Sequence, residues 1–392
     1  MTMIAIKSIS YRRILNSHVE FTTEFIIELE DGSVGRGASP QGETISIYED
    51  RNIPINPQTI IRQITKDGYI GRPIDQAVFD DYLEGRFKMF GRNNAFSLSL
   101  SYFRATEQSL SLFELFGRPR KKLTAPKLCC NILNGGWHAY TNPVLSDFHE
   151  YILVAAHNDI EAVIASHNEI QKAVKEKLLT QSKTVVAGNP VNRFSTADNR
   201  ECIDFLLKIR DTLGFSKQFE LMIDASGTDL WTEKGYSLSI TDKSLRSSEE
   251  FREYWLSIIG QYKLSFLEDP FHENDGEAWH VLTTSQKDCK IIGDNYYSSD
   301  AERIARGAAQ NHTHGAIIKP NQSGTVSGVR KAIEAAERCG QIVITSHRSI
   351  STEETFLSTL TCMHEAPYIK IGPLVTDYSS VVRLNDIIRL TS

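Results

Sequence analysis

Short apolar segments recur through the second half of the chain, and a charged or polar residue follows each of them directly. These residues are Asp224, Glu268, Asp294, Lys319, His347 and Lys370. After a longer first interval they follow one another about every 25 residues, roughly the length of one βα unit. In a β/α barrel the carboxyl ends of the strands meet at one mouth, where the active site is built. The spacing therefore predicts that these side chains ring a single site.

The two parts of the chain differ in their pattern. The predicted strands of the first part span 3–10, 20–30 and 33–38, and its predicted helices span 57–66, 74–86 and 93–116. Beyond a basic linker at 118–122, apolar strands, polar loops and amphipathic helices alternate, as in a parallel α/β domain. We therefore predict an α+β domain over residues 1–125 and a barrel domain over residues 126–392.

Composition narrows the possible partners. A net charge of −6 and a pI near 6.0 argue against nucleic acid or an anionic membrane as the main partner. No signal peptide and no apolar run long enough to span a membrane are evident. The six cysteines are scattered and form no CxxC pair, so we expect a reduced, cytoplasmic setting and no zinc site.

The residues that follow the apolar segments also predict a chemistry. Asp224, Glu268 and Asp294 form a hard oxygen-ligand set with no Cys or His, which suits Mg²⁺. Lys319, Arg348 and Lys370 supply positive charge for an anionic substrate, and arginine can bind a phosphate or carboxylate through two hydrogen bonds. A partly desolvated lysine near other cations can serve as a base. We therefore expect Lys319 to remove a proton and the metal to stabilise the resulting enolate.

Each of these residues has a simpler interpretation when it is taken alone. A single acid after a strand is more often a helix N-cap or a surface charge. Lys319 alone would more often be a surface lysine, and His347 alone would more often be a structural histidine. Six such residues at successive strand ends favour a site over six unrelated surface positions.

Longer motifs resemble the enolase family. IIKPNQSGTVSG (317–328), ITSHRSISTEETF (344–356) and IKIGPLVTDYSSVVRLNDIIRL (369–390) are similar to its C-terminal half. Its metal-ligand strands, its NGG-x-H loop and its leading strands are similar to LMIDASGTDLW (221–231), SFLEDPF (265–271), IIGDN (291–295), NILNGGWHAY (131–140) and ILNSHVEFTTEFIIELEDGSVGRGASPQG (14–42). The resemblance covers nearly the whole chain. It implies an α+β domain capping a modified, TIM-like β/α barrel, assembled as a dimer or larger oligomer.

The resemblance also implies roles for single residues. Asp224, Glu268 and Asp294 would bind Mg²⁺, and Lys319 would be the base. Lys370 would stabilise the enolate together with the metal, and Arg348 and Ser349 would hold the substrate phosphate. His138 and His347 would line the pocket. Glu150 matches a catalytic glutamate of the family, and Asp147 is a competing match.

This chain differs from the family pattern at two places, and both differences affect the step in which the substrate hydroxyl leaves. Where the family has an Asp-Glu-Gly-Gly segment, whose glutamate helps the substrate hydroxyl to leave, this chain has Ala187, Gly188 and Asn189. Gln41 replaces a metal-binding serine on the loop near the substrate, so we expect Gln41 at the substrate site. A nearby acid, namely Glu43, Glu150 or Asp147, is the alternative proton donor.

Three hypotheses of function follow. The first is an Mg²⁺-dependent enolase reaction, which converts 2-phosphoglycerate to phosphoenolpyruvate. The second is a specialised homologue that acts on another phospho- or phosphono-carboxylate, such as a carboxyphosphonoenolpyruvate synthase-like enzyme of phosphonate biosynthesis. The third is a catalytically weak protein used for binding, and the complete set of metal-ligand residues counts against it.

Overall fold

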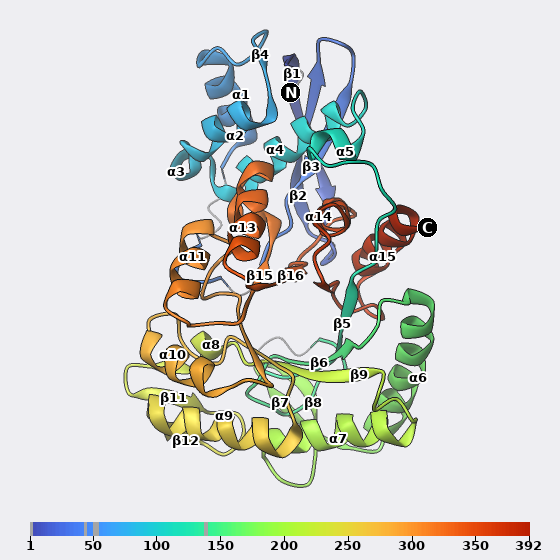
Figure 1. The fold of residues 1–392 in the computed structure, drawn as a ribbon, viewed down its shortest axis with the longest axis vertical. Helices are drawn as coiled ribbons and strands as arrows, with labels where there is room; N and C mark the ends of the chain where they lie inside the picture. Colours follow the sequence, from blue (N-terminus) through green and yellow to red (C-terminus); the bar gives the residue numbers. More distant parts are fainter. Residues whose placement is uncertain (1–2, 43–44, 50–54, 137–139) are drawn as a thin grey trace.

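The computed structural model describes residues 3–42, 45–49, 55–136 and 140–392. It shows an N-terminal cap and a closed barrel beneath it (Figure 1). The cap contains β1 (Ile4–Leu15), β2 (Phe21–Leu29), β3 (Val34–Ala38), β4 (Pro73–Ile74), α1 (Pro57–Lys66), α2 (Gln76–Glu84), α3 (Phe87–Phe90), α4 (Arg92–Thr106) and α5 (Leu112–Leu115). Its sheet has the strand order β3-β2-β1-β4. The predicted fold class, an α+β domain followed by a modified β/α barrel, is confirmed.

The cap sheet packs closely on one helix. An added Cβ at Gly35 of β3 would lie 1.9 Å from the backbone oxygen of Ser101 in α4, so only glycine permits this approach. The predicted helix 93–116 is wrong in its extent, because α4 ends at Thr106 and α5 begins afresh at Leu112. Ser111 caps α5 in a capping box with Glu114, which favours a new helix start there.

The barrel closes in the strand order β13-β14-β15-β16-β17-β5-β6-β9. Its strands are β5 (Lys127–Asn134), β6 (Glu150–Ala155), β9 (Phe219–Asp224), β13 (Phe266–Glu268), β14 (Lys290–Gly293), β15 (Gly315–Ile318), β16 (Ile342–Ser346) and β17 (Tyr368–Lys370). β6 runs antiparallel to both of its neighbours, β5 and β9. The pairs from β9 through β13 to β17, and from β17 to β5, are parallel. The predicted domain boundary after residue 125 stays a prediction, although β5 begins at Lys127.

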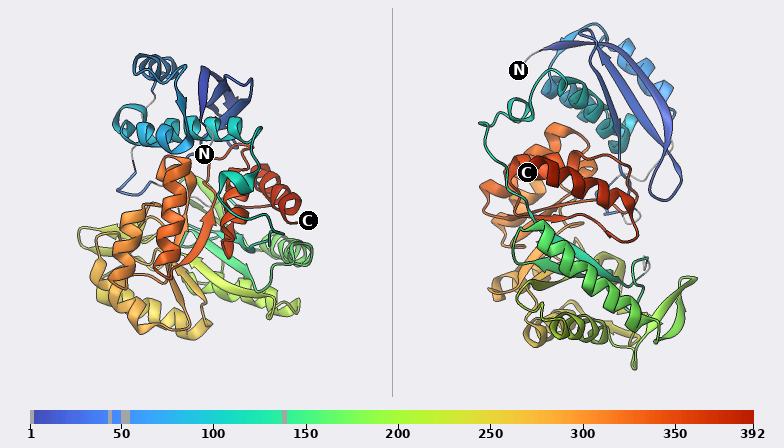
Figure 2. Two further views of the ribbon diagram at one scale, coloured as in Figure 1. Left: turned by 45° about the horizontal axis from the view of Figure 1, so that its top comes forward. Right: turned by 90° about the vertical axis from the view of Figure 1, so that its right-hand side faces the viewer.

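Helices and short strands surround this barrel (Figure 2). The helices are α6 (Ile160–Leu178), α7 (Asn199–Thr212), α8 (Gly227–Leu230), α9 (Ser248–Tyr262), α10 (Gly276–Ser285), α11 (Ala301–Ala309), α12 (Pro320–Ser323), α13 (Val326–Arg338), α14 (Phe356–His364) and α15 (Tyr378–Thr391). The outer strands are β7 (Ser182–Val186), β8 (Asn189–Arg193), β10 (Trp231–Thr232), β11 (Gly235–Leu238) and β12 (Ser244–Arg246). No helix in the described part of the chain is long and apolar enough to cross a membrane.

Apolar side chains fill the barrel interior. Ile152, Met222, Ile292, Ile317 and Ile344 are fully buried there and belong to one cluster. A filled interior leaves no channel, so ligands can bind only above it, at the ends of the strands. The larger core cluster packs the outer face of the strands against the helices.

A buried carboxylate joins the cap to the barrel. Asp80 of α2 is fully buried and accepts a 2.8 Å hydrogen bond from the backbone nitrogen of Ser327 in α13. The Gln76 side chain donates to its other oxygen at 2.9 Å. Burial raises the pKa of Asp80 from 3.8 to about 6.

This carboxylate predicts a pH-dependent stability. The folded protein holds the Asp80 proton more tightly than the unfolded chain does, so the favourable contribution is complete below about pH 4 and is lost as the pH rises through about 6. As Asp80 loses its proton, the wild type should lose about 2–3 kcal/mol of its free energy of unfolding. D80N has no carboxyl group at this position, so its free energy of urea unfolding should depend less on pH. The D81N variant changes an exposed neighbour and should keep the wild-type profile. Parallel profiles for D80N and wild type would contradict the assignment.

Candidate active site

The carboxyl ends of adjacent parallel strands bring three predicted acids together. In the barrel register Glu268 of β13 lies beside Asp224 of β9, and Asp294 follows directly after β14, the next strand. All three side chains are buried or nearly so. Lys319, Arg348 and Lys370 come from β15, β16 and β17 on the same rim. The spacing in the sequence therefore corresponds to neighbouring positions at one mouth.

Glu150 reaches this mouth by a different route. It is the first residue of β6, and because β6 runs antiparallel its beginning lies where the other strands end. In the register Glu150 lies opposite Asp224 of β9 and Asn134 of β5. Asn131 donates a 2.8 Å hydrogen bond to Glu150 Oε1. The competing match, Asp147, instead accepts hydrogen bonds from the backbone of Ile240 at 2.8 Å and from Asn199 at 3.2 Å.

The ammonium of Lys370 lies at the centre of the acidic group. Its Nζ is 2.8 Å from Glu150 Oε2, 3.1 Å from Asp224 Oδ2 and 2.8 Å from Glu268 Oε2. Burial alone would lower the pKa of Lys370, but the three carboxylates outweigh it and raise that pKa well above its ordinary value. Lys370 is therefore a buried cation that compensates the charge of these acids.

Lys319 forms an ion pair with Asp294, the third acid of the mouth. The backbone nitrogen of Lys319 donates to Ser299 Oγ at 2.8 Å, and Pro320 begins the short helix α12 directly after it. This explains why an apolar strand ends in a lysine, because the ammonium meets a carboxylate rather than the core. Asp294 Oδ1 is buried and has no hydrogen-bond partner within the described part of the chain. That oxygen is available to an incoming cation or hydrogen-bond donor.

A cavity of about 280 Å³ lies above these groups. Glu150, Asp224, Asp294, Lys319, His347, Arg348, Ser349 and Lys370 all line it. Burial, together with the charges of Arg383, Lys370 and Lys319, lowers the pKa of His347 well below its ordinary value, so its ring is neutral at pH 7. The His347 Nδ1 lies 2.8 Å from the Arg348 backbone oxygen. The cavity thus joins acids, lysines and an arginine, a set that suits a small anionic substrate.

Sequence reasoning missed a histidine in this cavity. His149 directly precedes Glu150, is buried, and lies 3.2 Å from Asp229 through its Nε2. Burial disfavours the charged ring, but Asp229 outweighs this and raises the pKa of His149. In the sequence HEYIL (149–153), His149 and Glu150 stand together at the start of the strand. Because this strand is antiparallel to its neighbours, both residues reach the mouth. The cap contributes Ser17 and His18, from its first hairpin, to the same cavity.

Gln41 and the segment without the family's acid are not among the residues that line this cavity. Gln41 pairs through its backbone with Ile350 at 2.7 Å and lines a second cavity rather than the one above the acids. Ala187 and Gly188 form the exposed turn between β7 and β8, with φ angles of 49° and 84°. His138 lies outside the described residues, as does Glu43.

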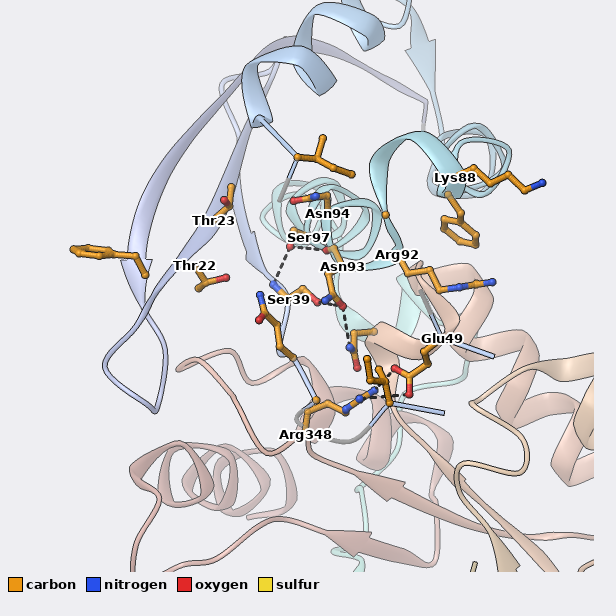
Figure 3. Close-up of a pocket in the computed structure, with 18 residues that line it drawn as sticks. Thr22, Thr23, Ser39, Glu49, Lys88, Arg92, Asn93, Asn94, Ser97 and Arg348 are labelled. Carbon is orange, nitrogen blue, oxygen red and sulfur yellow. Dashed lines mark hydrogen bonds and ion pairs between the residues drawn. The ribbon is translucent and has the colours of Figure 1, made fainter. Parts of the chain in front are cut away.

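The second cavity, of about 480 Å³, lies between the cap and the barrel (Figure 3). Polar side chains of the cap form much of its wall, including Ser39, Asn93 and Ser97. Arg348 and Gly42 line both cavities, so they stand between them. In Figure 3 Arg348 and Glu49 point toward one another across this boundary.

A capped β/α barrel with acids and lysines ringed at one mouth has the architecture of a barrel enzyme. A family model described as "Enolase, C-terminal TIM barrel domain" matches residues 122–392. The chain therefore belongs to the enolase family and is an enzyme of the lyase class.

Curated relatives named enolase align along nearly the whole chain. That of Natronomonas pharaonis is 29% identical over 409 residues, which cover 99% of each chain. That of Acidothermus cellulolyticus is 28% identical over 425 residues, covering 98% of this chain and 95% of the relative. That of Haloarcula marismortui is 29% identical over 405 residues, covering 99% of each chain. The likeness thus includes the cap as well as the barrel.

Proposed function

We propose that this enzyme removes the proton next to the carboxylate of 2-phosphoglycerate and eliminates water, which forms phosphoenolpyruvate. The observation that supports the proposal most is that one acid-lined cavity contains two lysines with different acid partners, Lys319 beside Asp294 and Lys370 beside Glu268. A lysine that can accept a proton and a second cation that can stabilise a developing enolate are what this reaction needs.

Lys319 is the proposed base. Its ammonium is held at the cavity by Asp294 and its backbone by Ser299, so a substrate carbon above it would meet a fixed group. Such positioning accounts for much of the rate acceleration of enzymes, because the reacting groups are already held close together in the right orientation. Because an ammonium has no lone pair, Lys319 would first release one proton to solvent, and its neutral amine would then take the proton from the substrate carbon.

The three acids fit Mg²⁺ in their chemistry. They offer only oxygen ligands, they are adjacent in the barrel, and the buried Asp294 Oδ1 lacks a partner among the described residues. In the arrangement described here the two ammonium groups lie against these carboxylates, and no three of the described His, Cys, Asp or Glu residues form a metal-ligand group. We propose that Asp224, Glu268 and Asp294 would hold Mg²⁺, which would supply positive charge for the enolate oxygens.

The substrate phosphate has a proposed place at Arg348 and Ser349. Arg348 follows β16 and its side chain is buried, whereas Ser349 is exposed at the cavity. Burial strengthens a charge-assisted hydrogen bond because less water competes for it. The phosphate would thus be bound at Arg348 and Ser349 in the same cavity as the acids, and the carboxylate of the substrate would face Lys370.

Departure of the hydroxide is the step that this chain handles differently. The turn at Ala187 and Gly188 carries no acid, whereas Glu150 lines the cavity. We propose that Glu150, beside His149, assists the leaving hydroxyl. The same turn favours a second candidate function, a specialised homologue that acts on another phospho- or phosphono-carboxylate. A dimer or larger oligomer and a cytoplasmic location belong to the proposal as well.

The test is product formation from 2-phosphoglycerate. We expect phosphoenolpyruvate to accumulate with Mg²⁺ and to stop accumulating when a chelator removes the metal, because the carboxylates then lack their cation. Phosphorus NMR distinguishes the two compounds directly. Product formation that continues at full rate in excess chelator would contradict the metal assignment, and no product under any metal condition would favour the second candidate.

A further inference from the structure

Glu49 of the cap forms a buried ion pair with Arg348 of the barrel. Glu49 Oε2 lies 2.7 Å from Arg348 Nη1, and the two side chains are only 9% and 4% exposed (Figure 3). The two residues are 299 positions apart in the sequence. The arginine proposed to receive the substrate anion therefore already has an anionic neighbour supplied by the protein itself.

The surroundings restrict both partners. An added Cβ at Gly42 would lie 1.6 Å from Arg348 Nη2, so the backbone of residue 42 closes against the guanidinium. On the side of Glu49, Ser46 Oγ donates a 2.9 Å hydrogen bond to the backbone oxygen of Asn295, which follows the acid Asp294. The segment that carries Glu49 is thus anchored on the mouth itself.

The second carboxylate oxygen of Glu49 leads to the proposed base. Gln322 Nε2 donates to Glu49 Oε1 at 3.0 Å, and Ser299 Oγ donates to Gln322 Oε1 at 2.7 Å. The backbone nitrogen of Lys319 donates to the same Ser299 Oγ at 2.8 Å. Glu49 is therefore bonded directly to Arg348 and, through two buried side chains, to the backbone of Lys319.

A buried guanidinium needs this kind of partner. Removing one member of a buried ion pair leaves an uncompensated charge, which then attracts any anion that can reach it. A partner that holds the arginine in one orientation also sets the position in which a bound substrate is held for reaction. Burial opposes ionisation of Glu49, but Arg348 outweighs it and lowers the pKa of that carboxyl, so Glu49 is charged at pH 7.

We propose that Glu49 is a positioning residue, which holds Arg348 in place and offsets its charge until the anionic group of the substrate binds. The inference rests on the proposed function in one respect, namely that Arg348 receives this group. It predicts two opposite effects of removing the charge. Anions bind more tightly to Arg348 once the negative charge of Glu49 is gone, and the substrate turns over more slowly because the arginine no longer holds it in register.

The first test uses inorganic phosphate as the probe, with calorimetry of the whole protein. We expect E49Q to bind phosphate about tenfold more tightly than wild type, since charge pairs of this closeness couple strongly. E354Q is the matched control, because Glu354 pairs at 2.5 Å with Arg104 and also joins the barrel to the cap, but it lines neither of the two cavities described above. It should leave phosphate affinity unchanged. R348Q should lose phosphate binding.

The second test compares kcat with KM for 2-phosphoglycerate. We expect E49Q to lower kcat about tenfold without raising KM. Because a smaller folded fraction would lower the apparent kcat in the same way, the stoichiometry of phosphate binding gives the active fraction of each variant, and kcat is expressed per active site. E49D, which keeps the charge, should recover part of kcat. The proposal would be overturned if E49Q bound phosphate no more tightly than wild type, or if its kcat were unchanged. It would also be overturned if R348Q still bound phosphate. Absence of turnover in wild type would refute the proposed substrate alone, because the phosphate comparison would still decide the role of Glu49.

Discussion

Lys319→Ala is expected to lower kcat for 2-phosphoglycerate by about 10²–10⁴-fold, the usual contribution of a positioned base. The reason is geometric, because the ammonium is held at the cavity by Asp294 and by the hydrogen bond between its backbone and Ser299. Alanine leaves the metal-ligand residues in place but removes the proton acceptor. Exchange of the substrate C2 proton with solvent should disappear together with product formation.

The control for this variant is Lys331→Ala. Lys331 is an exposed lysine of α13 that pairs loosely with Asp81 and Glu84 at 3.7 and 3.8 Å. Its removal should leave kcat and C2 exchange at wild-type values. Circular dichroism of both variants checks that each is folded. Substantial turnover by a folded Lys319→Ala variant would show that another group is the base.

Lys370→Met is expected to be the most destabilising substitution at the mouth. The variant leaves Glu150, Asp224 and Glu268 buried without their cation, and breaking a buried ion pair in this way costs about 3–5 kcal/mol. Mg²⁺ should restore more stability to this variant than it adds to wild type, because the divalent cation meets carboxylates that have lost the ammonium in contact with them. Urea unfolding with and without Mg²⁺ measures both effects.

Lys121→Met provides the comparison for stability. Lys121 pairs with Glu365 at 2.5 Å, but both side chains are well exposed, and such surface pairs contribute at most about 1 kcal/mol. If Lys370→Met were as stable as Lys121→Met, the buried acids would have to be neutral or otherwise paired. If Mg²⁺ stabilised wild type and Lys370→Met equally, it would bind away from these acids.

The positions of the acids and lysines at the mouth could be predicted because parallel strands impose a simple rule. Asp224 and Glu268 end their barrel strands and Asp294 directly follows the next one, and adjacent strands bring their ends together whatever the intervening helices contain. Lys319 and Lys370 obey the same rule. A local pattern, an apolar run and the residue after it, was therefore enough to predict which side chains meet.

The rule fails where a strand is reversed or where a contact is distant in the sequence. β6 runs antiparallel, so the residues that reach the mouth stand at its beginning, and His149 escaped notice for that reason. Glu49 escaped because its partner, Arg348, lies in the other half of the chain. Neither a periodic pattern nor a local propensity reports such a pairing.

Element boundaries in the cap were harder to predict than the barrel spacing. β1 runs on to Leu15, beyond the predicted end at residue 10, because the hairpin register continues until Leu15 meets Phe21. Its last residues do not alternate between buried and exposed, because those from Ser10 to Arg13 are all exposed. Pairing with a neighbour decided the length of this strand, and the strand's own sequence did not reveal it.

The central claim is that Lys319 removes the proton at C2 of 2-phosphoglycerate and that the same site then eliminates water. The most direct measurement is the reaction of the Mg²⁺-loaded protein with 2-phosphoglycerate in D₂O, followed by proton and phosphorus NMR. The claim predicts formation of phosphoenolpyruvate in the wild type and its loss in Lys319→Ala. Exchange of the C2 proton without formation of phosphoenolpyruvate would support proton removal but not the elimination of water, and would favour a different substrate. If the wild type showed no exchange of the C2 proton and formed no phosphoenolpyruvate, the claim would be contradicted.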